Sequence, residues 1–285
     1  MTAISPLHLN PPRDITIWPN GLQIFTKLNE YLKPSSKTPA STTAQSISDL
    51  TPLKPPTKDD KGEQNELDNF LYAFWEMLIE ISKQIPHDHP SQDRLFSVVE
   101  ALSKIKKMVV DSQEPIAILA DLPSFSTSMR VSWESTLERN PPTTYENAQK
   151  WINMNAFAAR LLNIRRVSWT RFAVWAMRSA LEEESTSPQL DWDIEAAVVW
   201  LTYCGDVLFS QLMHRTKLRI SPAGQHTGSL YDGEPTLDLQ RWRFWKGRFA
   251  EIGERDDAEV GTIVRGAKGR MEEIEERYHR TLGPR

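Results

Sequence analysis

Large apolar side chains recur at intervals of three and four residues along most of this chain, from about residue 65 to its end. Leu67, Phe70, Leu71 and Phe74 are the first to show this spacing. It places apolar side chains on one face of a helix, whereas a half-buried strand would alternate them. Neither an alternating segment of any length nor a repeat of fixed period occurs. The sequence therefore predicts an all-α fold, an irregular multi-helix bundle of about nine or ten helices.

The first 64 residues have a different composition from the rest of the chain. Nine of the nineteen prolines precede residue 57, and residues 34–62 consist largely of Pro, Ser, Thr, Lys and Asp. Such a segment buries too little apolar surface to offset the entropy lost on ordering. We therefore expect residues 1–64 to form a partly disordered N-terminal region, with one or two short helices and a flexible linker. Residues 65–285 are expected to form the helical domain.

Local signals predict where several helices begin. Ser91 is a residue type favoured at the helix N-cap, and Thr143 with Glu146 matches the capping box. The helix expected over residues 193–213 is apolar on most of its circumference. A helix of that kind is normally buried, so we expect it at the centre of the fold.

Charge and cysteine content indicate the cellular compartment in which we expect the protein. The net charge is −4, from 34 basic and 38 acidic residues, which predicts no attraction to nucleic acid or to anionic membranes. The single cysteine, Cys204, excludes an intrachain disulfide. The most apolar run, residues 196–209, is interrupted by Thr202, Gly205 and Asp206, so no membrane span is expected. No signal-peptide pattern begins the chain. We expect a cytoplasmic protein that is not secreted, with the nucleus as the alternative.

Motifs that carry known chemistry are missing from the sequence. The tripeptide His87-Asp88-His89 has metal-ligand residue types, but it lies between two prolines where a helix–helix turn is expected. We interpret it as a solvated turn and predict no metal site. Cys204 lies in mid-helix and is interpreted as a small core residue. A phosphate-binding glycine loop, a nucleophile elbow and a metalloprotease motif do not occur, so we assign no catalytic residue and no cofactor.

Residues 241–249 alternate basic and aromatic side chains, as single-stranded nucleic-acid sites do. Helical spacing places Trp242 and Trp245 on one face and Arg243 and Lys246 on the other. Residues 234–285 hold eleven basic and eleven acidic side chains, so no net positive field develops. An amphipathic core helix is therefore the favoured interpretation.

Several polar residues fall on apolar helices, where buried polar groups need partners. Arg160 could pair with Glu182 or with Glu195, and Arg178 precedes Glu182 by four residues. A structural network of ion pairs and hydrogen bonds is the favoured interpretation. The alternative is a polar pocket that orients a small ligand. The candidate ligand-binding residues are Asn155, Arg160, Tyr203 and Arg241.

Several blocks of this sequence together resemble one family. The blocks are Gln92-Asp93-Arg94-Leu95, Asp121-Leu122-Pro123, and the segments 151–161, 172–182, 196–205 and 241–249. The chain is similar over roughly residues 65–255 to a large fungal family catalogued as a domain of unknown function, number 3632. The resemblance implies a helical fold and a filamentous-fungal origin, and it implies no reaction. One departure is that Ile118-Leu119-Ala120 stands where an aromatic residue commonly precedes the Asp-Leu-Pro segment.

Two functions are consistent with these features. The first is a non-enzymatic protein that binds a protein partner or a small apolar molecule through a helical bundle. The second is an enzyme or accessory protein of a fungal secondary-metabolite biosynthetic cluster, which would hold an apolar substrate and act by positioning it. A nucleic-acid-associated regulator, with Arg243 and Lys246 as the contact, is a third and less favoured hypothesis.

Overall fold

The computed structural model describes residues 7–51, 61–105, 119–139, 144–164, 169–184, 189–214, 218–219, 227–255 and 259–281. These ranges contain ten helices and one antiparallel pair of two-residue strands, which confirms the all-α fold class. Contacts divide the chain into two compact units, residues 1–141 and 142–285, and each is described by itself.

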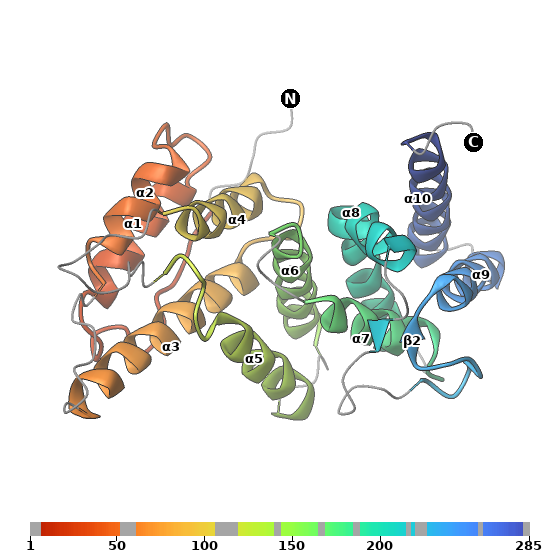
Figure 1. Ribbon diagram of the computed structural model, residues 1–285, viewed down its shortest axis with the longest axis horizontal. Coiled ribbons are helices and arrows are strands. Elements are labelled where there is room, and N and C mark those ends of the chain that lie inside the picture. The colour runs from red at the N-terminus through yellow and green to blue at the C-terminus, as the bar shows by residue number, and fades with distance from the viewer. Residues whose placement is uncertain are drawn as a thin grey trace. The chain divides into compact units, whose positions relative to one another are not determined.

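Five helices make up the described part of the first unit (Figure 1). They are α1 (Gly21–Leu32), α2 (Ala40–Ser48), α3 (Lys61–Gln84), α4 (Pro90–Ser103) and α5 (Phe125–Arg139). Helix α2 packs on α4 and on α1, so this grouping differs from the sequence-based division at residue 64. Helices α1 and α2 are the short helices expected in the N-terminal region, and α2 lies within residues 34–62, which were expected to be otherwise mostly flexible. Residues 52–60 of that segment lie outside the described residues.

Helix α3 supplies the aromatic core of this unit. Phe70, Phe74 and Trp75 are fully buried along it. The Trp75 ring stacks on Phe125 of α5 at 4.3 Å between centroids, and Trp75 Nε1 donates a hydrogen bond of 2.6 Å to the carbonyl oxygen of Pro123. The Asp-Leu-Pro segment is therefore held by a tryptophan of α3.

Side chains in the first turn of α4 donate hydrogen bonds to backbone carbonyls near the C-terminal ends of α1 and α3. Ser91 Oγ donates to the Leu32 carbonyl and Arg94 Nε donates to the Tyr31 carbonyl, both at the end of α1. Gln92 Nε2 donates to the carbonyls of Ser82 and Ile85, near the end of α3, at 3.0 and 2.8 Å. Terminal helix carbonyls need such partners when they are buried. The N-terminal turn of α4 is therefore hydrogen-bonded to the C-terminal ends of both α1 and α3.

Two predicted helix caps lie one or two residues from the observed ones. The N-cap of α4 is His89, whose Nδ1 accepts from the backbone N–H of Ser91, so Ser91 itself is not the cap. The N-cap of α6 is Thr144, whose Oγ1 accepts from the Asn147 N–H. In the first case Pro90 occupies the first helical position, which favours a helix start before Ser91.

Five further helices and the strand pair form the described part of the second unit (Figure 1). They are α6 (Tyr145–Leu161), α7 (Thr170–Leu181), α8 (Gln189–His214), β1 (Leu218–Arg219), β2 (Thr236–Leu237), α9 (Leu239–Arg255) and α10 (Glu259–Thr281). Helix α8 packs against α6, α7 and α10, and α9 packs against α10. The central position predicted for the apolar helix is confirmed for α8 within this unit.

A candidate functional site at the kink of helix α8

The interface between α6 and α8 is built around Asn155, a fully buried amide. Its Nδ2 donates to the Trp151 carbonyl at 2.9 Å, and its Oδ1 accepts from Nε1 of Trp200 at 2.8 Å. Both Asn155 and Trp200 are 0% exposed. A buried polar group that meets its partners in this way fixes the alignment of two helices.

Arg160 and Tyr203 form the next contact along the same interface. The Arg160 guanidinium carbon lies 3.5 Å from the centroid of the Tyr203 ring, which is cation–π geometry. Arg160 is buried, and its Nη1 donates to the Ala156 carbonyl. Tyr203 is partly exposed, and it packs on Ile152 and Val199. The stack therefore has a buried cation on one side of an aromatic ring that reaches the surface.

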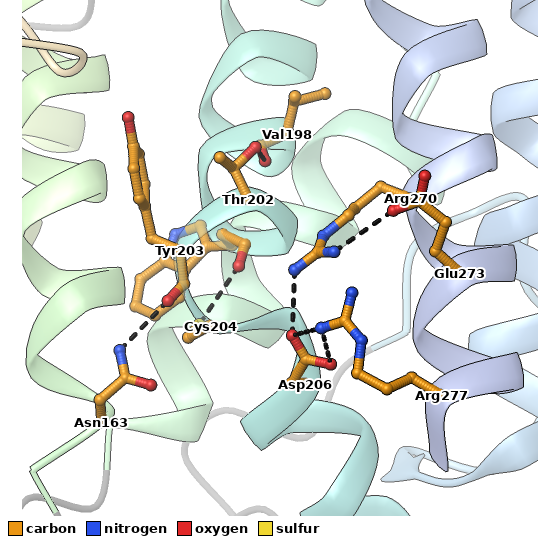
Figure 2. Close-up of polar contacts among 10 residues, drawn as sticks. Asn163, Val198, Thr202, Tyr203, Cys204, Asp206, Arg270, Glu273 and Arg277 are labelled. Carbon is orange, nitrogen blue, oxygen red and sulfur yellow. Dashed lines mark hydrogen bonds and ion pairs between the residues drawn. The ribbon is translucent and has the colours of Figure 1, made fainter. Parts of the chain in front are cut away.

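Helix α8 is kinked directly after Tyr203. Cys204 has φ −145° and ψ 15°, outside the helical region, so two helical halves meet at this residue. Side chains bond carbonyls around the kink: Asn163 Nδ2 donates to Tyr203, Cys204 Sγ to Trp200, and Thr202 Oγ1 to Val198 (Figure 2). Bonds from Thr and Cys side chains to carbonyls four residues back compete with the helical ladder and bend helices.

The residue types at the kink explain why α8 breaks there. Threonine, cysteine and glycine follow one another within positions 202–205, and all three have lower helix propensity than alanine or leucine. A Cβ at Gly205 would lie 2.6 Å from Cδ1 of Ile274, so α10 approaches the backbone closely at this point. A larger residue at position 205 would require the end of the Ile274 side chain to move.

Cys204 is not arranged as a nucleophile. The residue is 3% exposed, and burial raises the pKa of its thiol well above the ordinary value. A reactive cysteine needs a depressed pKa, so the thiol is a core group here. This arrangement agrees with the interpretation of Cys204 drawn from the sequence.

On the other side of the kink, Asp206 holds two arginines of α10. Arg277 Nη1 lies 2.8 and 2.9 Å from the two carboxylate oxygens, and Arg270 Nη2 lies 3.0 Å from Oδ2. Arg270 also bonds to Glu273. Figure 2 shows Asn163 and Tyr203 on one side of the kinked turn and the two arginines on the other. We call Asp206, Arg270 and Arg277 the α10 clamp.

Arg241, the fourth predicted ligand-binding residue, belongs to a different network. Its Nε and Nη2 donate to the two carboxylate oxygens of Glu182 at 2.7 and 2.9 Å. The same carboxylate accepts from Trp245 Nε1 at 2.6 Å and from the Gly228 N–H at 3.1 Å. Glu182 is 0% and Arg241 1% exposed, so this is a fully buried, bidentate ion pair. Each oxygen of the Glu182 carboxylate accepts two hydrogen bonds.

These contacts change two of the predicted pairings. Glu182 binds Arg241, which lies 59 residues away, and not Arg160. Arg178 Nε lies 3.1 Å from Glu183, the neighbour of its predicted partner Glu182. The pairing of Arg160 with Glu195 stays a prediction. So does ligand binding by the four candidate residues, of which three meet at the α6–α8 interface.

The sequence did not identify Asn163 or the α10 clamp as parts of this site. Asp206 had been noticed only as an interruption of an apolar run, and its arginine partners are 64 and 71 residues away. Local spacing carries no signal for pairs so far apart. The interruption itself was the available hint, because a carboxylate in an apolar helix faces either solvent or a cation, and the Asp206 side chain, 45% exposed, does both.

Basic residues of α9 and His89, which were also considered as candidates in the sequence, make contacts that support the fold. Three basic residues of α9 pair with carboxylates, namely Arg241 with Glu182, Lys246 with Glu275 and Arg248 with Glu251. The expectation that Lys246 lies opposite Trp242 is wrong, because the two are four residues apart and both bond Glu275. His89 caps α4, and among the described residues no group of three or more His, Cys, Asp or Glu side chains could hold a metal ion.

Within the described residues, α8 is also the one helix whose length and apolar character would suffice to cross a bilayer. Of its most apolar 18-residue window, 56% is buried inside the protein, which is the behaviour of a core helix. The interruptions at Thr202, Gly205 and Asp206 coincide with the kink and the clamp.

The fold and the site together define an all-α protein whose core helix is kinked and held by side-chain hydrogen bonds on two sides. The model of one family, described as a protein of unknown function (DUF3632), matches residues 75–249. The match covers more than half of the chain, and the protein belongs to this family, which confirms the resemblance noted in the sequence. A comparison with curated proteins and another with solved structures each found no match.

Proposed function

We propose that this protein is a non-enzymatic binding protein, and that a protein partner or a small apolar molecule contacts it at Tyr203. The observation that supports this proposal is the way Tyr203 is held. Arg160 lies 3.5 Å over its ring, and Asn163 bonds its carbonyl, yet the side chain is partly exposed. Tyrosine is enriched at binding hot spots, and an immobilised side chain loses less entropy on binding.

The four candidate residues have different parts in this proposal. Tyr203 makes the direct contact, and Arg160 fixes its ring from behind. Asn155 and Arg241 act as support, because both are buried and hydrogen-bonded to other parts of the second unit. A ligand that reached either of them directly would have to displace those bonds at a cost of about 1–3 kcal/mol for each buried group left unpaired.

A photo-cross-linker beside Tyr203 tests the proposal. Thr202 is exposed and adjacent, so Thr202→benzoylphenylalanine in the native host cells should yield an adduct of defined mass. The same change at Thr262, an exposed residue of α10, is the matched control and should yield none. Adding Tyr203→Ala should abolish the adduct at position 202. Equal labelling at both positions, or labelling that survives Tyr203→Ala, would contradict a contact at Tyr203.

The alternative, an enzyme or accessory protein of a fungal secondary-metabolite pathway, predicts a different outcome. Purified protein added to an extract of small molecules from the same cells would then change the amount of one compound over time. Arg160→Ala would abolish that change. Such turnover would replace the binding proposal.

A further inference from the structure

The two halves of α8 are held by different neighbours. The half that ends at Tyr203 is bonded by Asn163, which lies two residues after the end of α6. The half that begins after Cys204 is bonded through Asp206 to α10. One backbone position, Cys204, therefore stands between two sets of tertiary contacts.

The side-chain bonds on either side of the kink lie where water can replace them. Asn163 is exposed and the Asp206 side chain is 45% exposed, so both can exchange their protein partners for water. Exchange of one hydrogen bond for another changes the free energy far less than loss of one. A straightened α8 would rotate Asp206 relative to Tyr203, because the backbone torsions of Cys204 join the two halves.

We propose that Cys204 is a hinge which couples the Arg160–Tyr203 contact to the α10 clamp. A molecule that binds at Tyr203 would then change how firmly α10 is held, and loosening of α10 would change binding at Tyr203 by the same factor. The hinge itself does not depend on the proposed function, because it concerns two contacts within the second unit.

The single cysteine of the chain reports on the hinge. Cys204 is 3% exposed and its Sγ bonds to the Trp200 carbonyl, so a disulfide reagent such as Ellman's reagent can react only after an opening. The labelling rate at pH 8, measured together with the urea-unfolding equilibrium, separates local opening at the kink from global unfolding. Labelling through the hinge should be faster than the global unfolding equilibrium allows.

Two variants and their combination measure the coupling. Asp206→Asn weakens the clamp, and Asn163→Ala removes the bond to the Tyr203 carbonyl; because both contacts are partly exposed, each should raise the labelling rate about threefold to fivefold. The double variant should differ from the product of the two single effects by about threefold or more. Glu251→Gln, which removes an exposed ion pair within α9 and touches neither α10 nor the kink, is the control and should leave the rate within about twofold of wild type after correction for stability.

Two results would overturn the hinge. The first is labelling that follows the global unfolding equilibrium in wild type and in every variant, because then the kink never opens by itself. The second is a double variant whose rate equals the product of the two single effects, because then the contacts on either side of Cys204 are independent.

Discussion

At the scale of single residues, the buried pair of Glu182 and Arg241 has the largest predicted effect on stability. Glu182→Gln leaves the Arg241 guanidinium buried without a countercharge, and we expect a loss of about 3–5 kcal/mol in the free energy of unfolding. Urea unfolding followed by circular dichroism measures this loss. Glu183→Gln is the control, because its pair with Arg178 is partly exposed and should be worth no more than about 1 kcal/mol.

Replacement of both partners separates charge from shape. Glu182→Leu combined with Arg241→Met should recover most of the stability lost in either single variant, because well-packed apolar residues often replace a buried ion pair without loss. If the double variant were as unstable as Glu182→Gln, the bonds from Trp245 and Gly228 to the carboxylate would be the main source of stability.

Asp193 makes the stability of the second unit depend on pH between about 4 and 7. Burial raises the pKa of this carboxyl from 3.8 to about 6, although a hydrogen bond from Gln189 opposes the rise. The folded protein therefore binds the proton more tightly than the unfolded chain, and ionised Asp193 destabilises the fold above pH 6. As the pH falls from 7 to 4, this cost of about 2–3 kcal/mol is relieved.

The matched variant for this carboxyl is Asp193→Asn, which cannot ionise. At pH 8 we expect it to be more stable than wild type by about 2–3 kcal/mol, and the difference should disappear near pH 4. Urea unfolding at several pH values gives the two curves. A difference that stayed constant from pH 8 to pH 4 would mean that Asp193 has an ordinary pKa.

At the scale of helices, glycines within α10 and α8 should respond differently to alanine. A Cβ at Gly266 or Gly269 meets nothing within 4 Å, so each change to alanine should add about 0.5–1 kcal/mol by raising helix propensity. Gly205→Ala should gain less than either, because the new methyl group displaces Cδ1 of Ile274, the end of a buried side chain, and this offsets the gain in propensity. Thermal unfolding midpoints rank the three variants. A Gly205→Ala gain equal to those at Gly266 and Gly269 would show that Ile274 does not crowd position 205.

The capping of α1 and α3 by α4 also gives a prediction for the first unit. Gln92→Leu leaves the carbonyls of Ser82 and Ile85 without their side-chain donor, and we expect a loss of about 1–3 kcal/mol. Gln45→Leu is the control, because its bond to Asp49 is exposed and should contribute within about 0.5 kcal/mol. Equal losses in the two variants, measured by urea unfolding, would contradict the capping role.

The spacing of apolar residues predicted the existence of the helices more reliably than it predicted their first residues. The apolar face of α3 is visible in the spacing of Phe70, Leu71 and Phe74, because burial of one helix face is a local pattern. The start of α4 depends instead on His89 and Pro90, which compete with the favoured cap at Ser91. Residues of low helix propensity at positions 202–205 are a local signal for the kink of α8, whereas the bonds from Asn163 and from α10 depend on packing and have no local signal.

The candidate site likewise contains some residues that the sequence identified and others that it did not. Asn155 and Arg160 were recognisable, since polar residues on an apolar helix must find partners. Their partners were not, because Trp200 and Tyr203 are brought to their places by packing between helices. Residue identity thus revealed the need for a partner, whereas only the fold supplied it.

At the scale of the whole molecule, charge gives the last prediction. The net charge is −4, and three bases of α9 are paired with the carboxylates of Glu182, Glu275 and Glu251. Because paired bases release few counterions from a nucleic acid, we expect no binding of a labelled single-stranded oligonucleotide at micromolar protein between about 50 and 200 mM salt. Fluorescence anisotropy measures this.

A charge-reversed variant shows whether that assay could detect binding. Glu275→Lys with Glu251→Lys removes the acidic partners of Lys246 and Arg248 and adds two positive charges beside them. This variant should gain weak binding that falls steeply as salt rises, since each phosphate contact contributes to the slope. Wild-type binding with a steep slope, lost in Arg243→Ala, would instead identify the exposed face of α9 as a nucleic-acid surface, because that side chain is exposed while its neighbours are paired.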